Sequence, residues 1–232
     1  MLELNKVTYT YHTAAGNVQA VKNATADFET GKIYAITGRS GSGKTTLISM
    51  IAGLDVAESG EILLNNKDLK DMDRNAYRRE KIGMVFQSFH LLPQLTAAEN
   101  IELMLDLSKY SGDKKQRINN LLEMVGLTAF HGKKRPLQLS GGEQQRVAIA
   151  RALASDPEII IGDEPTGNLD NENSGNIVAI LKELSHKHNK CVIVVTHAQE
   201  VASEADIIYH MVDGVLDYPK KTAEVNNETV KQ

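Results

Sequence analysis

The sequence predicts an α/β fold in which an all-helical lobe interrupts the alternation of strands and helices. An apolar run at residues 33–36 passes through a glycine-rich turn into a helix that ends near Gly53. Residues 158–211 then alternate apolar strand-like runs with helical stretches, a pattern typical of a parallel sheet covered by helices. Between about residues 97 and 131 only helical signals appear, which indicates an inserted lobe.

The composition is that of an ordinary globular protein. The chain has 232 residues, 41% hydrophobic and 24% charged, enough for one large domain or one domain with an inserted lobe. Its net charge of −4 disfavours a protein that mainly binds nucleic acid. No run of about 18 apolar residues and no secretory signal is visible, so we expect a cytoplasmic protein that another subunit must hold at any membrane. The single cysteine, Cys191, lies in an apolar run and is expected to be buried.

The first third of the chain predicts an antiparallel sheet beside this core. Residues 2–12 show the partial apolar alternation of a half-buried strand. Further strand-like runs occur at residues 18–22 and 24–29, and another at residues 60–66 follows the first helix. Together they form an expected β-subdomain wrapped around the start of the α/β core.

The glycine-rich turn has the spacing GxxxxGK[ST], carried by Gly38, Gly43, Lys44 and Thr45. Backbone N–H groups of such a loop surround a phosphate, and the following helix adds the positive end of its dipole. Lys44 would reach the β- and γ-phosphates, and the Thr45 hydroxyl would bind Mg²⁺. The alternative is a plain glycine turn, but chance produces this pattern in only about one chain in a hundred. A nucleotide-phosphate site is therefore favoured.

Two carboxylates end the apolar strand predicted at residues 158–164. Asp163 and Glu164 lie at its carboxyl end, the edge at which open α/β sheets bind ligands. Beside a Mg²⁺–triphosphate, Asp163 would hold the metal through its water shell and Glu164 would act as general base toward water. An acidic strand end without function is the alternative for the pair taken alone.

Polar residues also follow two other predicted strands. His197 comes after the strand at residues 190–195 and could donate a hydrogen bond to a γ-phosphate oxygen or to leaving phosphate. Its alternative role is to cap the helix at residues 197–204. Gln87 follows the strand at residues 83–86 and could bind Mg²⁺ through its amide oxygen, or be an ordinary loop residue.

The helix predicted from Ser140 to about Ala154 has a second N-terminus suited to binding anions. Ser140 and Glu143 have the spacing of a capping box, which alone would explain both residues. With Gly141 and Gly142, the helix start also forms a second anion cradle. One nucleotide needs only one cradle, so the second suggests a nucleotide held by another subunit.

The remaining stretches complete the lobe and the C-terminal part. The other expected elements are helices at residues 73–81, 97–107, 113–125 and 171–188 and a strand at residues 206–211. A tight turn at Asp213 and Gly214 precedes a last short strand. From Pro219 onward the chain is expected to be a polar tail.

These motifs together resemble the nucleotide-binding domain of ABC transporters over nearly the whole chain. The matching segments are the P-loop at residues 38–46, the signature LSGGE at 139–143, the Walker B strand IIIGDE at 159–164, the Q-loop at Gln87, the switch at His197, the D-loop GNLD at 167–170, and Tyr11, near Val18, in the place of an aromatic ring under adenine. A P-loop followed by LSGGE at this separation is highly specific for that family.

The resemblance implies a single ABC ATPase domain: an α/β P-loop (RecA-like) ATPase core, an N-terminal antiparallel β-subdomain and an inserted α-helical subdomain. Residues 1–86 and 156–218 would form the ATP-binding core with the β-subdomain. Residues 87–155 would form the helical subdomain with the signature, and residues 219–232 the polar tail.

The resemblance also implies an ATPase that uses ATP and Mg²⁺ and becomes a head-to-tail homodimer when ATP binds. Each ATP would lie between the P-loop of one copy and the signature of the other. The implied catalytic residues are Lys44, Gln87, Glu164 and His197, and the implied metal ligands are Thr45, Gln87 and Asp163. Nucleotide contacts would come from Tyr11, Val18, Gly38, Ser40, Gly41, Ser42, Gly43, Lys44, Thr45 and Thr46. Contacts across the dimer would come from Ser140, Gly141, Gly142, Glu143 and Asp170.

A membrane permease subunit is the implied partner, docking near residues 87–93 at the inner face of the cell membrane. Exposed apolar side chains at Phe89, Leu91 and Leu92 would suit a coupling helix. Each of them could equally belong to a hydrophobic cluster beneath the helical lobe.

Two phrases point to a subgroup. DEPTGNLD at residues 163–170 and FHLLP at residues 89–93 are most similar to the macrolide-export and lipoprotein-release group, which implies efflux or force transmission across a membrane. A cell-division ATPase that regulates cell-wall remodelling shares the GNLD phrase and is the alternative. An ABC protein acting on DNA or ribosomes is disfavoured because the chain has neither coiled-coil arms nor a second nucleotide domain. A GTPase is disfavoured because no Asn-Lys-x-Asp motif is present.

Overall fold

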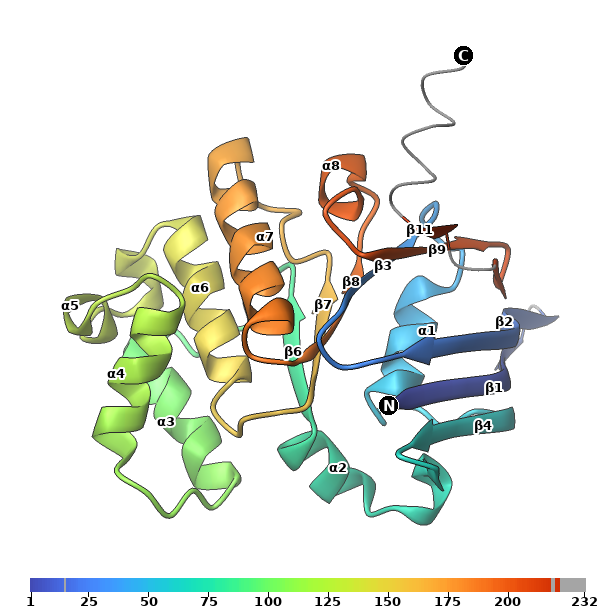
Figure 1. Cartoon of the computed structure of the whole chain (residues 1–232), viewed down its shortest axis with the longest axis horizontal. Helices are drawn as coiled ribbons and strands as arrows, with labels where there is room; N and C mark the ends of the chain where they lie inside the picture. The colour runs from blue at the N-terminus through green and yellow to red at the C-terminus, as the bar shows by residue number, and fades with distance from the viewer. Residues whose placement is uncertain (15, 218–219, 222–232) are drawn as a thin grey trace.

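The computed structural model describes residues 1–14, 16–217 and 220–221 of the chain, and Figure 1 shows their arrangement. The strands are β1 (Leu2–Thr13), β2 (Gly16–Phe28), β3 (Ile33–Thr37), β4 (Ser59–Leu64), β5 (Lys67–Asp68), β6 (Ile82–Phe86), β7 (Ile159–Asp163), β8 (Cys191–Val195), β9 (Ile207–Val212), β10 (Val215–Leu216) and β11 (Lys220–Lys221). The helices are α1 (Lys44–Ile51), α2 (Arg74–Glu80), α3 (Ala97–Leu107), α4 (Lys114–Met124), α5 (Ala129–Gly132), α6 (Gly141–Ala152), α7 (Asn171–His186) and α8 (Gln199–Ala202), with 3₁₀ turns η1 (Leu69–Asp71) and η2 (Pro136–Gln138). Apart from β11, the tail predicted at residues 219–232 lies outside the described residues.

The central sheet has seven strands, in the order β10-β9-β3-β8-β7-β6 with β11 also paired to β9. Strands β6, β7, β8, β3 and β9 run parallel, whereas β10 and β11 join β9 antiparallel. Every residue of β8, with the sequence CVIVV, is buried, as expected of a parallel strand covered on both faces. The sheet and its covering helices confirm the predicted α/β fold.

A second, antiparallel sheet in the order β2-β1-β4-β5 lies at one side of the molecule, as predicted. The expectation of two separate strands at residues 18–22 and 24–29 is wrong, because both runs belong to the single strand β2. Asn23 has φ 49°, and the register between β1 and β2 shifts near its neighbour Ala24. A β-bulge of this kind interrupts the apolar alternation, which makes one strand look like two in the sequence.

The helical lobe lies on the opposite side of the molecule from β1, β2 and β4 (Figure 1). It contains α3, α4 and α5, and between residues 97 and 131 the structure has no strand, as predicted. Helix α6 packs against α3, α4 and β6, the edge strand of the central sheet. It therefore joins the lobe to the sheet.

The sheet faces two hydrophobic cores because alternate residues of a strand point to opposite sides. In β3, Ile33 and Ala35 join the core of the helical lobe, whereas Tyr34 and Ile36 join the core shared with the antiparallel sheet. Cys191 is buried in the second core, as predicted, and burial raises the pKa of its thiol to about 12. Among the described residues, no helix is both long and apolar enough to cross a lipid bilayer.

Candidate functional site

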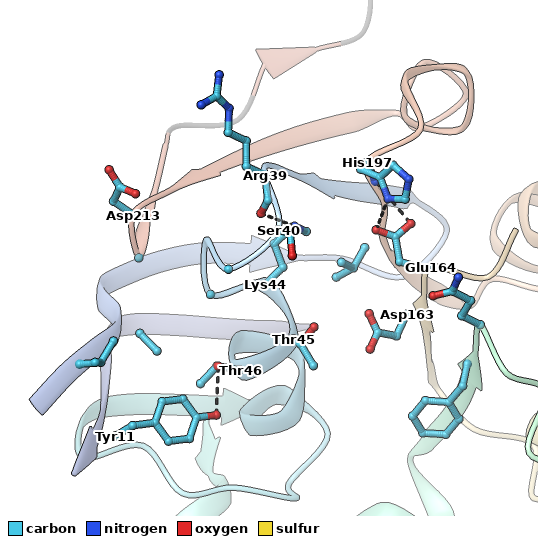
Figure 2. Close-up of a pocket in the computed structure, with 18 of the residues that line it drawn as sticks. Tyr11, Arg39, Ser40, Lys44, Thr45, Thr46, Asp163, Glu164, His197 and Asp213 are labelled. Carbon is cyan, nitrogen blue, oxygen red and sulfur yellow. Dashed lines mark hydrogen bonds and ion pairs between the residues drawn. The ribbon is translucent and has the colours of Figure 1, made fainter. Parts of the chain in front are cut away.

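An open cleft of about 1100 Å³ lies at the carboxyl edge of the central sheet. Register pairs Phe86 with Asp163 and Asp163 with Val195, so the residues that follow these three strands emerge side by side. The cleft is lined by these strand ends, by the loop between β3 and α1, by β1 and β2, and by the turn between β9 and β10. Of the predicted site residues, it brings together Tyr11, Val18, Ser40, Gly41, Gly43, Lys44, Thr45, Thr46, Gln87, Asp163, Glu164 and His197 (Figure 2).

The loop between β3 and α1 requires glycine for two separate reasons. A side-chain Cβ at Gly38 would lie 2.2 Å from Met211 O, and one at Gly43 would lie 2.1 Å from Ala20 O. A Cβ at Gly41 would meet nothing within 4 Å, but its φ of 78° favours glycine. The crowded glycines fix the loop against β2 and β9, and Gly41 lets the backbone turn where it lines the cleft.

The N-terminus of α1 has spare hydrogen-bond donors. Its N-cap is Gly43, so no side chain accepts from the first backbone N–H groups, and no acidic residue lies in its first turn. The hydroxyl oxygen of Ser42 is buried and has no hydrogen-bond partner among the described residues. Such unpaired donors, together with the helix dipole, fit a bound anion.

Two charged groups face this helix end. The Lys44 side chain is nearly buried, and its Nζ donates to Gly38 O at 2.8 Å and to Arg39 O at 2.9 Å. Asp163 lies across from it, and burial, reinforced by the Glu164 charge and partly offset by Lys44, raises the pKa of the Asp163 carboxyl. A cation that reached this carboxylate would relieve the cost of its charge.

Glu164 has a strained backbone and a histidine partner. Its φ is 49°, in the left-handed region that residues other than glycine avoid, and its N–H donates to Val195 O at 2.9 Å. One carboxylate oxygen, Oε1, lies 2.7 Å from His197 Nδ1, and the other accepts weakly from the His197 N–H at 3.4 Å (Figure 2). The Glu164 side chain is 18% exposed and that of His197 72%. The backbone of Glu164 is thus held by β8 and its carboxylate by His197, at the cleft where a general base is needed.

The oxygen donors of the cleft fit Mg²⁺. Thr45 and Asp163 face each other across it in Figure 2, and Gln87 lines the same cleft. The part of the chain that the structure describes has no group of three or more His, Cys, Asp or Glu residues that could hold a metal by themselves. Mg²⁺ commonly binds through one or two carboxylates, waters and substrate phosphates rather than in an all-protein cage. A hydroxyl, a carboxylate and an amide oxygen are therefore a suitable set.

An exposed aromatic ring stands at the far end of the cleft. Tyr11 and Val18 are cross-strand neighbours in β1 and β2, and both are exposed. The Tyr11 hydroxyl lies 3.2 Å from Thr46 Oγ1, and the Tyr9 and Tyr11 rings form an edge-to-face pair with centroids 5.0 Å apart. These contacts hold a flat apolar surface next to the loop, where a nucleotide base could stack.

The predicted dimer contacts lie apart from the cleft. The segment 139–143 and Asp170 do not line it. The predicted capping box is confirmed: Ser140 Oγ accepts from the Glu143 N–H, and Glu143 accepts from the Ser140 N–H at 2.8 Å. That second hydrogen bond lowers the pKa of the Glu143 carboxyl.

The start of α6 also touches α7. A Cβ at Gly142 would lie 2.1 Å from Asn173 Oδ1, and Asn173 in turn donates to both oxygens of Asp170. The two segments predicted to face another subunit are therefore neighbours in this chain.

The apolar residues that follow β6 differ in exposure. Leu92 is 43% exposed, and Phe89 is half-buried beside Gly141. Of the two interpretations of Leu91, the structure supports the second: Leu91 is partly buried and packs against the core of the helical lobe. The Arg151 guanidinium of α6 donates to the carbonyls of Phe89 and His90, which fixes this segment to the lobe.

Sequence reasoning missed several residues of the cleft. Lys22, Arg39, His90 and Asp213 line it but were not predicted there. Arg39 occupies a variable position of the GxxxxGK[ST] pattern, so its charge could have been noticed. No local sequence pattern indicates Lys22 or Asp213 as a site residue. The turn that contains Asp213 is placed beside the loop between β3 and α1 by long-range hydrogen bonds, such as the one from Gly214 N–H to Ser42 O at 3.0 Å.

Comparisons of the sequence with family models and with curated proteins point to the same family. A family model described as "ABC transporter" matches residues 21–167. The chain is 42% identical over 229 residues to an uncharacterised ABC transporter ATP-binding protein, MJ0796, of Methanocaldococcus jannaschii, covering 95% of this chain and 97% of that protein. It is 42% identical to the macrolide export ATP-binding/permease protein MacB of Chlorobaculum tepidum, covering 97% of this chain but 35% of that longer protein. It is 38% identical to a lipoprotein-releasing system ATP-binding protein, LolD 2, of Rhodopirellula baltica, covering 94% of this chain and 89% of that protein.

Solved structures show the same likeness. A dimeric structure of the ATP-binding cassette MJ0796 in a post-hydrolysis state, bound to ADP and Pi, superposes with a TM-score of 0.87 at 40% identity, covering 96% of this chain and 99% of that one. A second dimeric structure of the same cassette also gives a TM-score of 0.87, at 41% identity and the same coverage.

Proposed function

The chain belongs to the ABC transporter family, as an ATP-binding subunit of the MacB and LolD type and an ATPase, and from this we propose that two copies close around two ATP molecules to drive a membrane partner. The partner would export a macrolide-, peptide- or lipoprotein-like substrate or transmit force across the membrane. The macrolide and lipoprotein classes are taken from the names of MacB and LolD 2.

One observation carries the dimer. The segment 139–143 is a glycine-rich helix start outside the cleft. One copy therefore offers a phosphate cleft and, elsewhere, a helix end whose remaining N–H groups and dipole could bind an anion. Joining two copies head to tail would place each end on the other's cleft. The structures of the MJ0796 cassette, which are dimeric, support this arrangement.

The residues of the cleft, and those of the loop between β3 and α1, would have different roles in the chemistry. Lys44, the Ser42 hydroxyl and the loop N–H groups would bind the phosphates, while Thr45, Gln87 and Asp163 would hold Mg²⁺. Bound Mg²⁺ would neutralise charge on the phosphate oxygens.

The remaining site residues would handle the water and the base. Glu164 would accept a proton from the attacking water, with His197 holding its carboxylate in place. Tyr11 and Val18 would support the adenine.

The membrane partner would dock on residues 87–93, placing this chain at the inner face of the cell membrane. Leu92 offers exposed apolar surface there, and Arg151 holds the backbone of the segment. Copurification of the partner from native membranes, followed by its identification, separates an exporter from a cell-wall regulator.

Glu164→Gln tests the proposal. Because the amide keeps the shape but cannot accept the proton, turnover should fall about a hundred- to ten-thousandfold while ATP still binds. Sedimentation with ATP and Mg²⁺ should then show a dimer, and adding Ser140→Arg should return it to a monomer that still binds ATP. Glu200→Gln, an exposed carboxylate on α8, is the control and should behave like the parent. Near-parental turnover of Glu164→Gln would exclude Glu164 as the general base. A Glu164→Gln variant that binds ATP but stays strictly monomeric would exclude the proposed dimer.

A further inference from the structure

Gln87 is held by a reciprocal amide pair. Its Nε2 donates to Asn168 Oδ1 at 3.1 Å, and Asn168 Nδ2 donates back to Gln87 O at 3.0 Å. The pair joins the residue after β6 to the turn after β7, which are 81 positions apart in the sequence. Because Nε2 is the atom that donates to Asn168, the amide oxygen of Gln87 is the atom that could bind a metal ion in the cleft.

Two further contacts restrict the same side chain. A Cβ at Gly167 would lie 2.8 Å from Gln87 Nε2 and 3.0 Å from its Cδ, so the amide of Gln87 lies directly on the Gly167 backbone. Just before Gln87, the carbonyl of Phe86 accepts from Nε2 of Gln145, a fully buried residue of α6, at 3.3 Å. The backbone of Gln87 is therefore anchored at one end and its amide at the other.

We propose that Asn168 and Gly167 are positioning residues, which orient Gln87 so that its amide oxygen faces the metal bound with the nucleotide. The inference rests on the proposed function, since it assumes that Gln87 is a metal ligand. It adds a link within one copy: residues 167–170 end at Asp170, the expected dimer contact, so the placement of Gln87 depends on the segment that meets the second copy. An outer-sphere partner that fixes a ligand's orientation strengthens metal binding.

The first test is Asn168→Ala. Without its acceptor, the Gln87 amide can rotate, so metal affinity should weaken about three- to tenfold. The probe is Mn²⁺ in place of Mg²⁺, titrated by electron paramagnetic resonance with the non-hydrolysable analogue AMP-PNP. Binding of the same analogue in EDTA should be unchanged, and the melting temperature should stay within about 2 °C of the parent, because the pair lies at the surface.

Gly167→Ala approaches the same amide from the other side. Its φ lies outside the left-handed region, so alanine is tolerated by the backbone, and the added methyl group pushes Gln87 instead. Metal affinity should fall by a similar factor. Asn176→Ala, which removes an exposed asparagine of α7, is the matched control and should bind Mn²⁺ like the parent.

A double-mutant cycle between Gln87→Ala and Asn168→Ala decides whether Asn168 acts through Gln87. In the Gln87→Ala background, Asn168→Ala should have no further effect on Mn²⁺ affinity. Additive losses, or a parental affinity of Asn168→Ala, overturn the inference while leaving the proposed function intact. If the parent chain itself fails to bind AMP-PNP, the proposed function fails instead, so the two failures are distinguishable.

Discussion

The chain carries two helix N-termini suited to anions, and they are finished in opposite ways. Helix α1 has Gly43 as its N-cap, with no side chain accepting from its first N–H groups and no acidic residue in its first turn. Helix α6 has Ser140 as its N-cap. The Ser140 hydroxyl and the Glu143 carboxylate already pair with backbone N–H groups. The first end leaves donors unpaired, and the second has satisfied part of its own.

This difference separates two tasks. An end with spare donors and a lysine can bind a phosphate by itself, because the anion supplies bonds that nothing else makes. A helix end that is already capped, with a carboxylate in its first turn, is stabilised less by a bound anion. Only its remaining N–H groups and its dipole can then contribute to phosphate binding. We therefore expect α1 to set the affinity for nucleotide and α6 to act only when a nucleotide is brought to it.

Lys44→Ala should cause the largest effect of the three variants, a loss of ATP affinity at the N-terminus of α1. Loss of a charged hydrogen-bond donor to phosphate costs about 2–3 kcal/mol, which is about a hundredfold in ATP affinity. Calorimetric titration of the monomer with ATP measures it. Lys187→Ala, at the exposed end of α7, is the control. An unchanged affinity of Lys44→Ala would count against the phosphate assignment.

Ser140→Ala should affect turnover but not the affinity of the monomer. Loss of the N-cap costs about 1 kcal/mol, a fall in melting temperature of about 2–4 °C. ATP affinity should stay within about twofold, while turnover should drop about tenfold because the hydroxyl is missing from the contact with the second copy. Asp113→Ala removes the comparable N-cap of α4 and should lower the melting temperature without changing turnover. If Ser140→Ala weakens ATP binding by the monomer, the division of tasks is wrong.

Glu143→Gln should give the smallest effect, one that depends on pH. The pKa of the Glu143 carboxyl is lowered mainly by the Ser140 N–H, with Lys134 and His131 adding to the shift. The folded form thus favours the charged carboxylate, and the stability it adds is present above the ordinary pKa of about 4.3 and lost as the pH falls through the folded value.

The measurement is the melting temperature of the parent and of Glu143→Gln as a function of pH. The parent should melt higher by up to about 3 °C at pH 7, and the difference should shrink as the pH falls below the ordinary pKa and vanish once the pH is below the lowered folded pKa. Glu61→Gln, an exposed residue of β4, should show no such trend. A difference that persists at low pH would mean that shape rather than charge caps α6.

Local patterns predicted most of the fold and the centre of the site. The glycine loop, the carboxylates after β7 and the polar residues after β6 and β8 could be predicted because parallel strands deliver their carboxyl ends to one edge. Long-range contacts could not: Lys22 and Asp213 enter the cleft through the packing of β2 and the β9–β10 turn, which no local pattern encodes. Leu91 illustrates a further limit, since hydrophobicity alone does not distinguish a partly buried loop residue from an exposed one.

The central sheet divides its side chains between both halves of the molecule. In β8, Val192 and Val194 contribute to one core and Cys191, Ile193 and Val195 to the other. Removing either half would leave a bare apolar sheet face in water, so neither half is a detachable module. Proteolytic cleavage in the connection between α3 and α4 would therefore yield two fragments that remain associated without a covalent link.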